Sequence, residues 1–395
     1  MNTLRSYFAG VAAKYLSAVD ATPSKSNQHE IGSNKFTAIL GDPGKSKVVF
    51  EATFLYFNPD TDEPESCTDC VTWYDTRVGQ PHRSAEYRLY YRRNAITELL
   101  QAGDFCLIGM QPTGNLLIAI AQPNSSDEYR LRHLFDIEQP LDRWVVDRYI
   151  KESRINLATG QILEALGVEI YQGVTIDVDL LLSKFNKTFP STKVFSKYAR
   201  DTLARTISAI DDPDSALEAW MEHEEMLFRA LERSIVKEKL VAGFAEVDEF
   251  ISFSLSVQNR RKSRVGHALE NHLSAVFDAN ALRYERGGRT ENNSRPDFLF
   301  PGAHEYHNSA IGSPPLRMLG SKTTCKDRWR QVLAEAARIP EKHLFTLETA
   351  ISENQLREMN ASSLVLVSTP AVLSTYPVSL QHLTICLNEF IKIVK

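Results

Sequence analysis

A carboxylate, an ammonium group and a second carboxylate stand close together in the C-terminal third of this sequence. Asp297 follows Pro296 at the start of a short apolar run, Lys322 ends an alternating run, and Glu335 comes thirteen residues later. Hydrolysis of a phosphodiester needs a divalent cation that neutralises the phosphate and lowers the pKa of a water molecule. Carboxylates are the ligands that Mg²⁺ prefers, and a lysine can orient or deprotonate the attacking water. The pattern therefore predicts the metal site of a nuclease.

Two predicted strands would set the first two groups side by side. Residues 298–300 are fully apolar, which is typical of a buried strand, and residues 316–322 alternate like a second strand. If these strands are neighbours in one sheet, the Asp297 carboxylate and the Lys322 ammonium meet at its edge.

Predicted helices add two further carboxylates. A helix expected over 327–339 carries Glu335 on a polar stripe opposite its apolar face. Upstream, residues 264–280 keep a 3.6-residue apolar period, and Glu270 flanks the apolar face. Glu335 is thus the second candidate metal ligand, and Glu270 is a third carboxylate that would support the metal or its waters.

Taken one at a time, these residues are weak signals. A Pro-Asp pair before an apolar run is usually a turn, and a lysine at a strand end is usually solvated. Their joint placement on neighbouring elements, beside clusters of positive charge, is what favours catalysis.

Those clusters stand out because the whole chain is slightly acidic, with a net charge of −5. A protein that contacts DNA phosphates needs local positive patches, whatever its overall charge. The clustered residues are Arg77, Arg83, Arg88, Arg92 and Arg93; then Arg260, Arg261, Lys262 and Arg264; and finally Lys322, Lys326, Arg328 and Arg330.

The length of 395 residues favours two domains. Residues 1–148 contain short strands between turns, which indicates a mainly-β barrel or sandwich, and residues 149–182 are interpreted as a connection. Residues 183–395 alternate helices and strands, which predicts a mixed α/β sheet between helical layers. The predicted strands of the first part are 47–56, 85–91, 104–110, 116–122 and 129–135, with a short helix at 94–101. The other predicted elements of the second part are helices at 192–208, 217–240, 247–257 and 379–394 and strands at 343–347 and 363–368.

The composition also indicates a compartment. No apolar run is as long as a membrane span, and the N-terminus lacks an export signal. Five cysteines, an odd number, fit reduced thiols better than a disulfide framework. We therefore expect a cytoplasmic protein with no membrane partner.

Two other possible metal motifs carry little weight. Residues 67–70 (Cys-Thr-Asp-Cys) have ligand spacing, but no second pair follows at a usable distance, and a structural zinc needs four ligands. We interpret them as free thiols in a loop. His304 and His307 fall in a Gly/Pro-rich loop and are interpreted as surface residues.

Several segments closely resemble the EcoRII-type restriction endonucleases. They are Gln-Asn-Arg-Arg-Lys-Ser-Arg at 258–264, Pro-Asp-Phe-Leu-Phe-Pro at 296–301, Leu-Arg-Met-Leu-Gly-Ser-Lys-Thr-Thr-Cys-Lys-Asp-Arg-Trp-Arg-Gln at 316–331 and His-Leu-Phe-Thr-Leu at 343–347. The resemblance covers roughly residues 185–395. It implies the PD-(D/E)xK nuclease fold, magnesium dependence and cleavage of duplex DNA at a short site.

The catalytic residues carry over position by position. In this family the usual acid two residues before the lysine is displaced to a glutamate on the following helix. Here position 320 is glycine, and Glu335 occupies the displaced place. Glu270 matches the family's upstream helical carboxylate. The resemblance thus implies Asp297 and Glu335 as metal ligands and Lys322 as the lysine that orients the water.

The resemblance also implies where DNA is read. The segment after the catalytic lysine should enter the major groove with Lys326, Asp327 and Arg328, with Arg330 nearby. Arginine and lysine donate to guanine, and aspartate accepts from cytosine, so a G·C-rich palindrome containing CC/GG is expected. Residues 260–264 would grip phosphates, with Arg264 a possible base contact; a solvated helix face is the simpler alternative.

The N-terminal part resembles the family less closely. By analogy it is a DNA-binding pseudobarrel that takes a second, effector copy of the site or serves as a specificity element. Interleaved arginine and tyrosine suit phosphate and base contacts, although a solvated strand face is an equal alternative. The candidate contacts are Gln28, His29, Asn34 and Lys35 on one edge and Arg77, His82, Arg83, Arg88, Tyr90 and Arg92 on the other.

The expected function is that of a bacterial type II restriction endonuclease that leaves 5′-phosphate and 3′-hydroxyl ends. A palindromic target implies a homodimer, with part of the contact in 192–240. The resemblance further implies a cognate DNA methyltransferase as a functional rather than physical partner. Two alternatives stay open: a modification-dependent or repair endonuclease, and a catalytically inert DNA-binding regulator.

Overall fold

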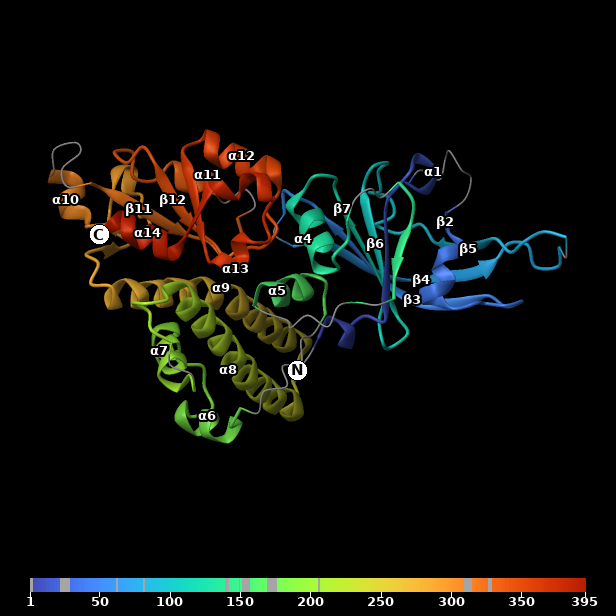
Figure 1. Ribbon diagram of the computed structural model, residues 1–395. Coiled ribbons are helices and arrows are strands. Elements are labelled where there is room, and N and C mark those ends of the chain that lie inside the picture. The colour runs from blue at the N-terminus through green and yellow to red at the C-terminus, as the bar shows by residue number, and fades with distance from the viewer. Residues whose placement is uncertain are drawn as a thin grey trace. The chain divides into compact units, whose positions relative to one another are not determined.

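The computed structural model describes residues 3–21, 29–61, 63–80, 82–138, 142–148, 150, 157–168, 176–204, 207–308, 315–325 and 329–395. The chain forms two compact units, each with its own sheet (Figure 1). The N-terminal unit comprises residues 1–171 with 350–352, and the C-terminal unit comprises 172–349 with 353–395. The division falls inside the segment 149–182, and that segment also contributes α5 (Leu157–Ala165) and most of α6 (Val178–Lys184).

The N-terminal unit is mainly β, as predicted. Its eight-stranded sheet has the order β2-β5-β4-β3-β7-β6-β1-β8. Neighbouring strands are antiparallel except for β3 and β7, which are parallel. The strands are β1 (Gly10–Tyr15), β2 (Glu30–Gly32), β3 (Val48–Phe57), β4 (Glu65–Asp75), β5 (Tyr87–Tyr91), β6 (Phe105–Met110), β7 (Leu116–Ala121) and β8 (Val145–Asp147).

The central strands of this sheet are buried on both faces. Alternate residues of β7 enter different cores, since successive side chains of a strand point to opposite sides. Leu117 packs in a core that includes residues of α4 (Ser126–Leu134) and α5. Ile118 packs in the other core, around Trp73.

A short 3-10 helix, η2 (Asn34–Phe36), links parts of the sheet that the strand order places far apart. Asn34 Nδ2 donates to the Ala85 carbonyl at 3.1 Å, just before β5. Lys35 Nζ donates to the Trp144 carbonyl at 2.9 Å, just before β8. The sheet is thereby partly closed on itself, as expected for a pseudobarrel.

Two local predictions for this unit are wrong. Residues 129–135, predicted as a strand, belong to helix α4, because Ser125 caps the helix and its face carries Leu131 into the core. Residues 94–101, predicted as a helix, form turns, since the Asn94 side chain accepts hydrogen bonds from nearby backbone amides.

Strand β4 lies where no strand is predicted, so Cys67 and Cys70 stand on a strand rather than in a loop. Both are free thiols. Residues three apart on a strand point to opposite faces of the sheet, which separates the two sulfur atoms.

The C-terminal unit has the mixed sheet that the sequence predicts. Its order is β14-β13-β12-β11-β10-β9, with β9, β10 and β11 antiparallel and β11 to β14 parallel. The strands are β9 (Glu285–Arg286), β10 (Phe298–Phe300), β11 (Arg317–Ser321), β12 (Lys342–Phe345), β13 (Leu364–Ser368) and β14 (Thr384–Cys386).

Helices cover both faces of this sheet (Figure 1). One layer contains α9 and α14, whose Phe277 and Phe390 pack with Phe300 of β10. The other contains α11 and α12. The helices of this unit are α6, α7 (Thr192–Thr202), α8 (Pro213–Ala242), α9 (Val247–Ala279), α10 (Ala303–Asn308), α11 (Trp329–Leu333), α12 (Glu353–Ala361), α13 (Pro370–Leu373) and α14 (Leu387–Val394), with 3-10 helices η3 (Glu291–Asn293) and η4 (Val378–Leu383).

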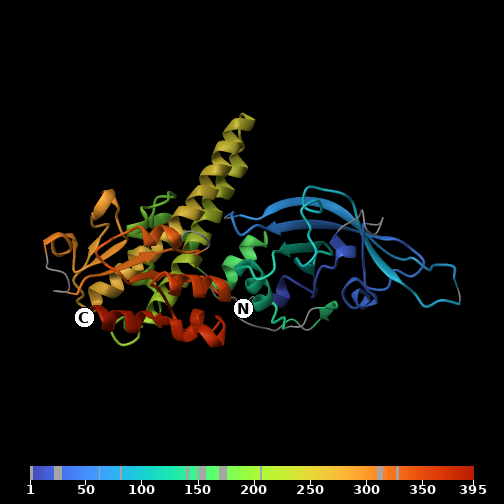
Figure 2. The same ribbon diagram turned by 90° about the horizontal axis from the view of Figure 1, so that it is seen from above.

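Several predicted boundaries in this unit differ from the structure. The two helices predicted at 247–257 and 264–280 are one helix, α9, whose first half extends beyond the sheet (Figure 2). The helix predicted at 379–394 is divided among η4, β14 and α14. His304 and His307 are exposed, as expected, but on α10 rather than in a loop. None of the helices in the described ranges has both the length and the apolarity needed to span a bilayer.

Candidate active site

Asp297 and Lys322 meet at one edge of the C-terminal sheet. Asp297 directly precedes β10 and Lys322 directly follows β11, and the pairing of these antiparallel strands brings the two positions together. Asp297 Oδ2 accepts hydrogen bonds from Ser321 N at 2.7 Å and from Lys322 Nζ at 3.3 Å. Both side chains stay partly open to solvent, with 22% and 25% of their surface exposed.

Glu335 completes this group. Its Oε2 is buried and has no hydrogen-bond partner within the described part of the chain. Burial raises the pKa of Glu335 to about 7; the negative charge of Asp297 acts in the same direction, and Lys322 and Lys342 act against it. Because the charge of Asp297 acts on the pKa of Glu335, the two carboxylates lie within electrostatic range of each other. We refer to Asp297, Lys322 and Glu335 as the sheet-edge group.

The donor set of this group fits a hard divalent cation. Two carboxylates that repel each other, one with an unpartnered buried oxygen, are stabilised when a cation lies between them. Mg²⁺ is commonly held by one or two carboxylates and keeps several of its waters. Among the residues that the structure describes, no three or more His, Cys, Asp or Glu side chains cluster as a complete ligand set. Asp297 and Glu335 are the two carboxylates of this group that could hold such a cation.

Glu335 lies in a turn rather than on the predicted helix over 327–339. The described part of α11 ends at Leu333, and the backbone of Ala336 has a positive φ of 49°, which is incompatible with continued α-helix. Lys342 supports this turn: its Nζ donates to the Ala336 carbonyl at 3.1 Å and to the Ile339 carbonyl at 2.7 Å. The sequence analysis misses Lys342, although a lysine at the start of an apolar strand is a detectable signal.

Gly320 explains why no acid stands two residues before Lys322. A Cβ atom at Gly320 would lie 3.0 Å from Val332 Cγ2, so α11 packs directly onto β11 at this point. A carboxylate there would collide with the helix layer and be buried in apolar surroundings. The carboxylate reaches the edge from Glu335 instead.

Glu270 is held by a neighbouring strand. It lies on α9, and Arg286 of β9 donates to its carboxylate at 2.5 Å and to Asn271 Oδ1 at 2.8 Å. Arg286 is paired with Phe298 across β9 and β10, next to Asp297. Glu270 thus faces the same end of the sheet, with its charge balanced by Arg286.

The segment expected to read bases is only partly visible. Lys326, Asp327 and Arg328 lie outside the described residues. Arg330 is on α11, where its guanidinium pairs with Glu358 at 2.8 Å and lies over the Trp329 ring.

Arg264 lies in the interior rather than on a DNA-facing surface. Only 5% of its side chain is exposed. It pairs with Glu225, lies 3.6 Å from Glu224 and stacks over Phe228 at 4.1 Å, all on α8. The guanidinium joins α8 to α9, and a DNA contact would require those interactions to break.

Its neighbours on α9 are more accessible. Arg261 pairs with Glu232 at 2.7 Å but keeps 47% of its side chain exposed. Arg260 stacks over Phe189 at 4.0 Å, and Lys262 is exposed.

In the N-terminal unit, most residues of the first candidate edge have structural contacts. Gln28 lies outside the described residues. The ring of His29 packs edge-on against Tyr91 at 5.6 Å. Asn34 and Lys35 make the closing hydrogen bonds described above.

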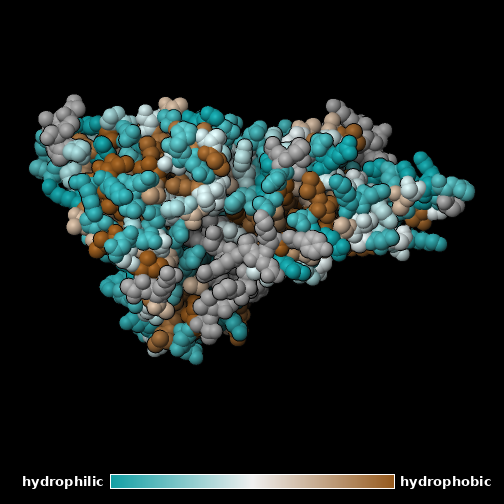
Figure 3. Space-filling view, in the orientation of Figure 1, coloured by the Kyte–Doolittle hydropathy of each residue, from teal (hydrophilic) through white to brown (hydrophobic). Residues whose placement is uncertain are grey.

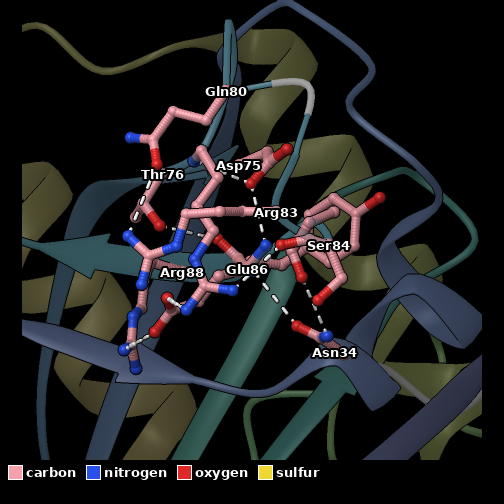
Figure 4. A network of polar contacts seen from close by, with 11 residues as sticks. Asn34, Asp75, Thr76, Gln80, Arg83, Ser84, Glu86 and Arg88 are labelled. Atoms are coloured by element: carbon pink, nitrogen blue, oxygen red, sulfur yellow. Dashed lines mark hydrogen bonds and ion pairs between the residues drawn. The ribbon is translucent and has the colours of Figure 1, made fainter.

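The second candidate edge divides into two sets. Arg77 and Arg88 both form ion pairs with Glu86. The Asp75 carboxylate accepts hydrogen bonds from the backbone amides of Arg77 and Glu86, and together these contacts close the connection between β4 and β5 (Figure 4). Arg83 lies on the exposed part of this network with one weak contact, to Gln80 at 3.4 Å. The exposed set is His82, Arg83, Tyr90 and Arg92.

Comparisons with known proteins identify similar sequences and structures. Residues 228–391 match the family model described as EcoRII C terminal. The chain is 37% identical over 255 residues to the type II restriction enzyme EcoRII of Escherichia coli, a match that covers 64% of this chain and 62% of that enzyme. The chain thus spans less than two thirds of the length of this relative.

Solved structures of two enzymes are similar only at a coarse level. Metal-depleted Ecl18kI in complex with uncleaved DNA has a TM-score of 0.45 and 17% identity, over 54% of this chain and 81% of that one. A restriction endonuclease PspGI–substrate DNA complex has a TM-score of 0.43 and 13% identity, over 56% and 97%. The similarity therefore lies in sequence: residues 228–391 are similar to the EcoRII C-terminal family, and the chain is similar over 255 residues to a type II restriction enzyme.

Proposed function

We propose that this protein is a type II restriction endonuclease that cuts both strands of DNA at a specific site with Mg²⁺ as cofactor. The observation that carries the proposal is the sheet-edge group: the Asp297 carboxylate contacts the Lys322 ammonium, and a buried oxygen of Glu335 has no hydrogen-bond partner among the described residues. The match to the EcoRII C-terminal family supports it.

The residues divide the work as follows. Asp297 and Glu335 would hold the cation, and Glu270, whose charge Arg286 balances, would support its water molecules. When bound, Mg²⁺ neutralises the phosphate and supplies a water of lowered pKa. Lys322 orients that water for in-line attack and stabilises the charge that develops on the phosphate. The products are a 5′-phosphate and a 3′-hydroxyl.

Site recognition is assigned to the segment after Lys322. Lys326, Asp327 and Arg328 carry the donors and acceptor that distinguish G·C pairs in the major groove, so we propose a G·C-rich palindrome containing CC/GG as target. Arg260, Arg261 and Lys262 are proposed phosphate contacts, since these residues are wholly or partly exposed. Arg330 belongs with the phosphate contacts, whereas Arg264 is assigned a structural role.

The N-terminal unit, residues 1–148 in this proposal, takes a second copy of the target through its exposed set, His82, Arg83, Tyr90 and Arg92. Arg77 and Arg88 shape that edge through Glu86. Asn34 and Lys35, used in closing the sheet, contribute less.

We further propose a homodimer that matches the two-fold symmetry of a palindrome. The hairpin of α8 and α9 supports this, because large apolar side chains are exposed at its tip, and hydrophobic surface is visible over the helical part of the C-terminal unit (Figure 3). These side chains are Leu240, Val241, Val247, Phe250, Ile251 and Leu255. The system would include a cognate DNA methyltransferase in a bacterial cytoplasm.

The test is cleavage of plasmid DNA by the purified protein with and without Mg²⁺, followed by sequencing of the ends. We expect cuts at one short palindrome only with the metal. Asp297→Ala should abolish cutting and leave specific binding in EDTA largely intact. Cutting by Asp297→Ala at the wild-type rate would contradict the proposal.

Two outcomes would favour the alternatives. Cleavage of methylated but not unmethylated plasmid would identify a modification-dependent nuclease. Specific binding with no cleavage in any divalent metal would identify an inert regulator.

A further inference from the structure

Glu335 stands on a connection of irregular backbone between α11 and β12, so something other than helix geometry must hold its carboxylate. The connection comprises residues 334–341, and its first part, 334–339, includes Ala336 with a positive φ; we call this first part the Glu335 turn. A glutamate on such a segment has no regular hydrogen-bond ladder to fix its direction.

Lys342 supports the turn from the sheet. It is the first residue of β12 and only 6% exposed. Its ammonium donates to two carbonyls of the turn, Ala336 O at 3.1 Å and Ile339 O at 2.7 Å. Burial of an ammonium is unfavourable unless its donors find acceptors, so these bonds anchor the turn to the strand.

Two other elements hold the same turn. Glu291 of η3 accepts a hydrogen bond from Ala337 N at 3.2 Å and one from the Tyr306 hydroxyl at 2.5 Å. Tyr306 of α10, fully buried, in turn accepts from Arg338 N at 3.1 Å. Four consecutive residues, 336–339, therefore each have a backbone group bound by a side chain from β12, η3 or α10.

We propose that Lys342 and the Glu291–Tyr306 pair are positioning residues that hold the Glu335 carboxylate at the sheet edge beside Asp297. The inference rests on the proposed function, because it takes Glu335 as a metal ligand. None of these residues touches the reacting atoms. They act by fixing the backbone from which Glu335 projects, as outer-shell groups orient metal ligands.

The first test compares Lys342→Met with wild type and with Lys342→Arg, which keeps donors at this position. In Lys342→Met we expect the Mg²⁺ concentration for half-maximal cleavage to rise roughly 10- to 100-fold. Specific DNA binding in EDTA should not change, and Lys342→Arg should recover part of the loss. Lys14→Met is the matched control: it removes a partly buried ammonium, paired with Asp20, from the N-terminal unit. Wild-type metal dependence in Lys342→Met would overturn the proposal.

A second readout needs neither metal nor activity. Hydrogen–deuterium exchange of the metal-free protein should be faster at the amides of Ala337 and Arg338 in Lys342→Met than in wild type or Lys14→Met. Unchanged protection of these amides would show that Lys342 does not hold the turn, whatever the enzyme's activity.

A double-mutant cycle with Glu335→Gln separates this inference from the proposed function. If Lys342 acts through Glu335, adding Lys342→Met to Glu335→Gln should cause little further loss of cleavage. Fully additive losses would overturn the positioning role. Wild-type cleavage by Glu335→Gln alone would instead remove Glu335 from the proposed function, and the exchange experiment would still decide whether Lys342 holds the turn.

If Lys342→Met does not fold, Tyr306→Phe replaces it, because it removes only a hydroxyl. Its control is Tyr284→Phe, which removes a hydroxyl bonded to Asp278 in the same unit. We expect a higher Mg²⁺ concentration for half-maximal cleavage and faster exchange of the Arg338 amide in the first variant only. Equal behaviour of the two would count against the proposal.

Discussion

The C-terminal unit contains two groups of charged side chains that behave differently. In the first, between α7, α8 and α9, Arg264 lies between Glu224 and Glu225, and His272 Nε2 lies 2.8 Å from Glu224 Oε2. We call these four residues the helix group. In the sheet-edge group, Asp297 and Lys322 are partly exposed, and one oxygen of Glu335 has no hydrogen-bond partner in the part of the chain that the structure describes. Both groups combine carboxylates with cations, so residue type does not separate them.

The two groups differ in whether nearby positive charges offset the effect of burial on the carboxylate pKa. Burial acts to raise the pKa of Glu225, but Arg264 and Arg229 overcome it and hold that pKa below its usual value. Burial raises the pKa of Glu335 to about 7, and the nearby lysines do not reverse it. Charges that are balanced within the protein join helices, whereas an unbalanced pair near solvent can take a cation.

The largest expected effect is that of Lys322→Ala. Loss of the ammonium should lower single-turnover cleavage roughly 10²- to 10⁴-fold, since the water loses its orienting group. Lys392→Ala, which removes an exposed ammonium from α14, should cut normally. If Lys322→Ala retains its rate, the sheet edge is as structural as the helix group and the contrast disappears.

Arg264→Met tests the other side of the contrast. It removes a guanidinium from between Glu224, which is fully buried, and Glu225, which keeps Arg229 as a partner, and this should lower the free energy of unfolding by about 3–5 kcal/mol. Urea unfolding at neutral pH measures this. Normal stability together with weakened DNA binding would return Arg264 to the DNA surface and contradict its structural role.

Glu335→Gln sharpens the contrast through pH. The folded pKa of about 7 exceeds the ordinary 4.5, so the folded protein binds an extra proton between these values and loses stability as pH rises through that window. At pH 8 the metal-free Glu335→Gln variant should be more stable than wild type by about 1–2 kcal/mol after allowance for solvent screening. Thermal unfolding of both proteins in EDTA at pH 5 and pH 8 measures the difference. If the variant and wild type are equally stable at both pH values, the raised pKa of Glu335 is refuted.

The smallest expected effect concerns the exposed set of the N-terminal unit. Arg83→Ala should make the slope of log binding constant against log salt concentration less steep by about one unit, because one phosphate contact is lost. Arg77→Ala should change the slope less, since Glu86 already balances that guanidinium. Binding titrations over a range of salt concentrations measure both, and a larger change for Arg77→Ala would reverse the assignment.

Local pattern was sufficient for much of the fold. Strands β3, β6 and β7 are apolar or alternating runs bounded by turns, and they appear where predicted. The local pattern was misleading for residues 129–135, because Tyr129, Leu131 and Phe135 fit both a two-residue and a helical period. Packing onto the sheet selects the helix there. The single helix α9 was divided because its first half has no buried face to produce a period.

The residue pattern alone predicts Asp297, Lys322 and Glu335 as candidate site residues, because motif spacing and apolar runs are properties of short stretches of chain. The burial of Arg264 and the anchoring of the Glu335 turn depend on folding. Arg264 meets Glu225 across 39 residues, and Tyr306 meets Arg338 across 32. Such contacts form only when helices and strands pack, since whether a charge is balanced depends on neighbours that chain order does not reveal.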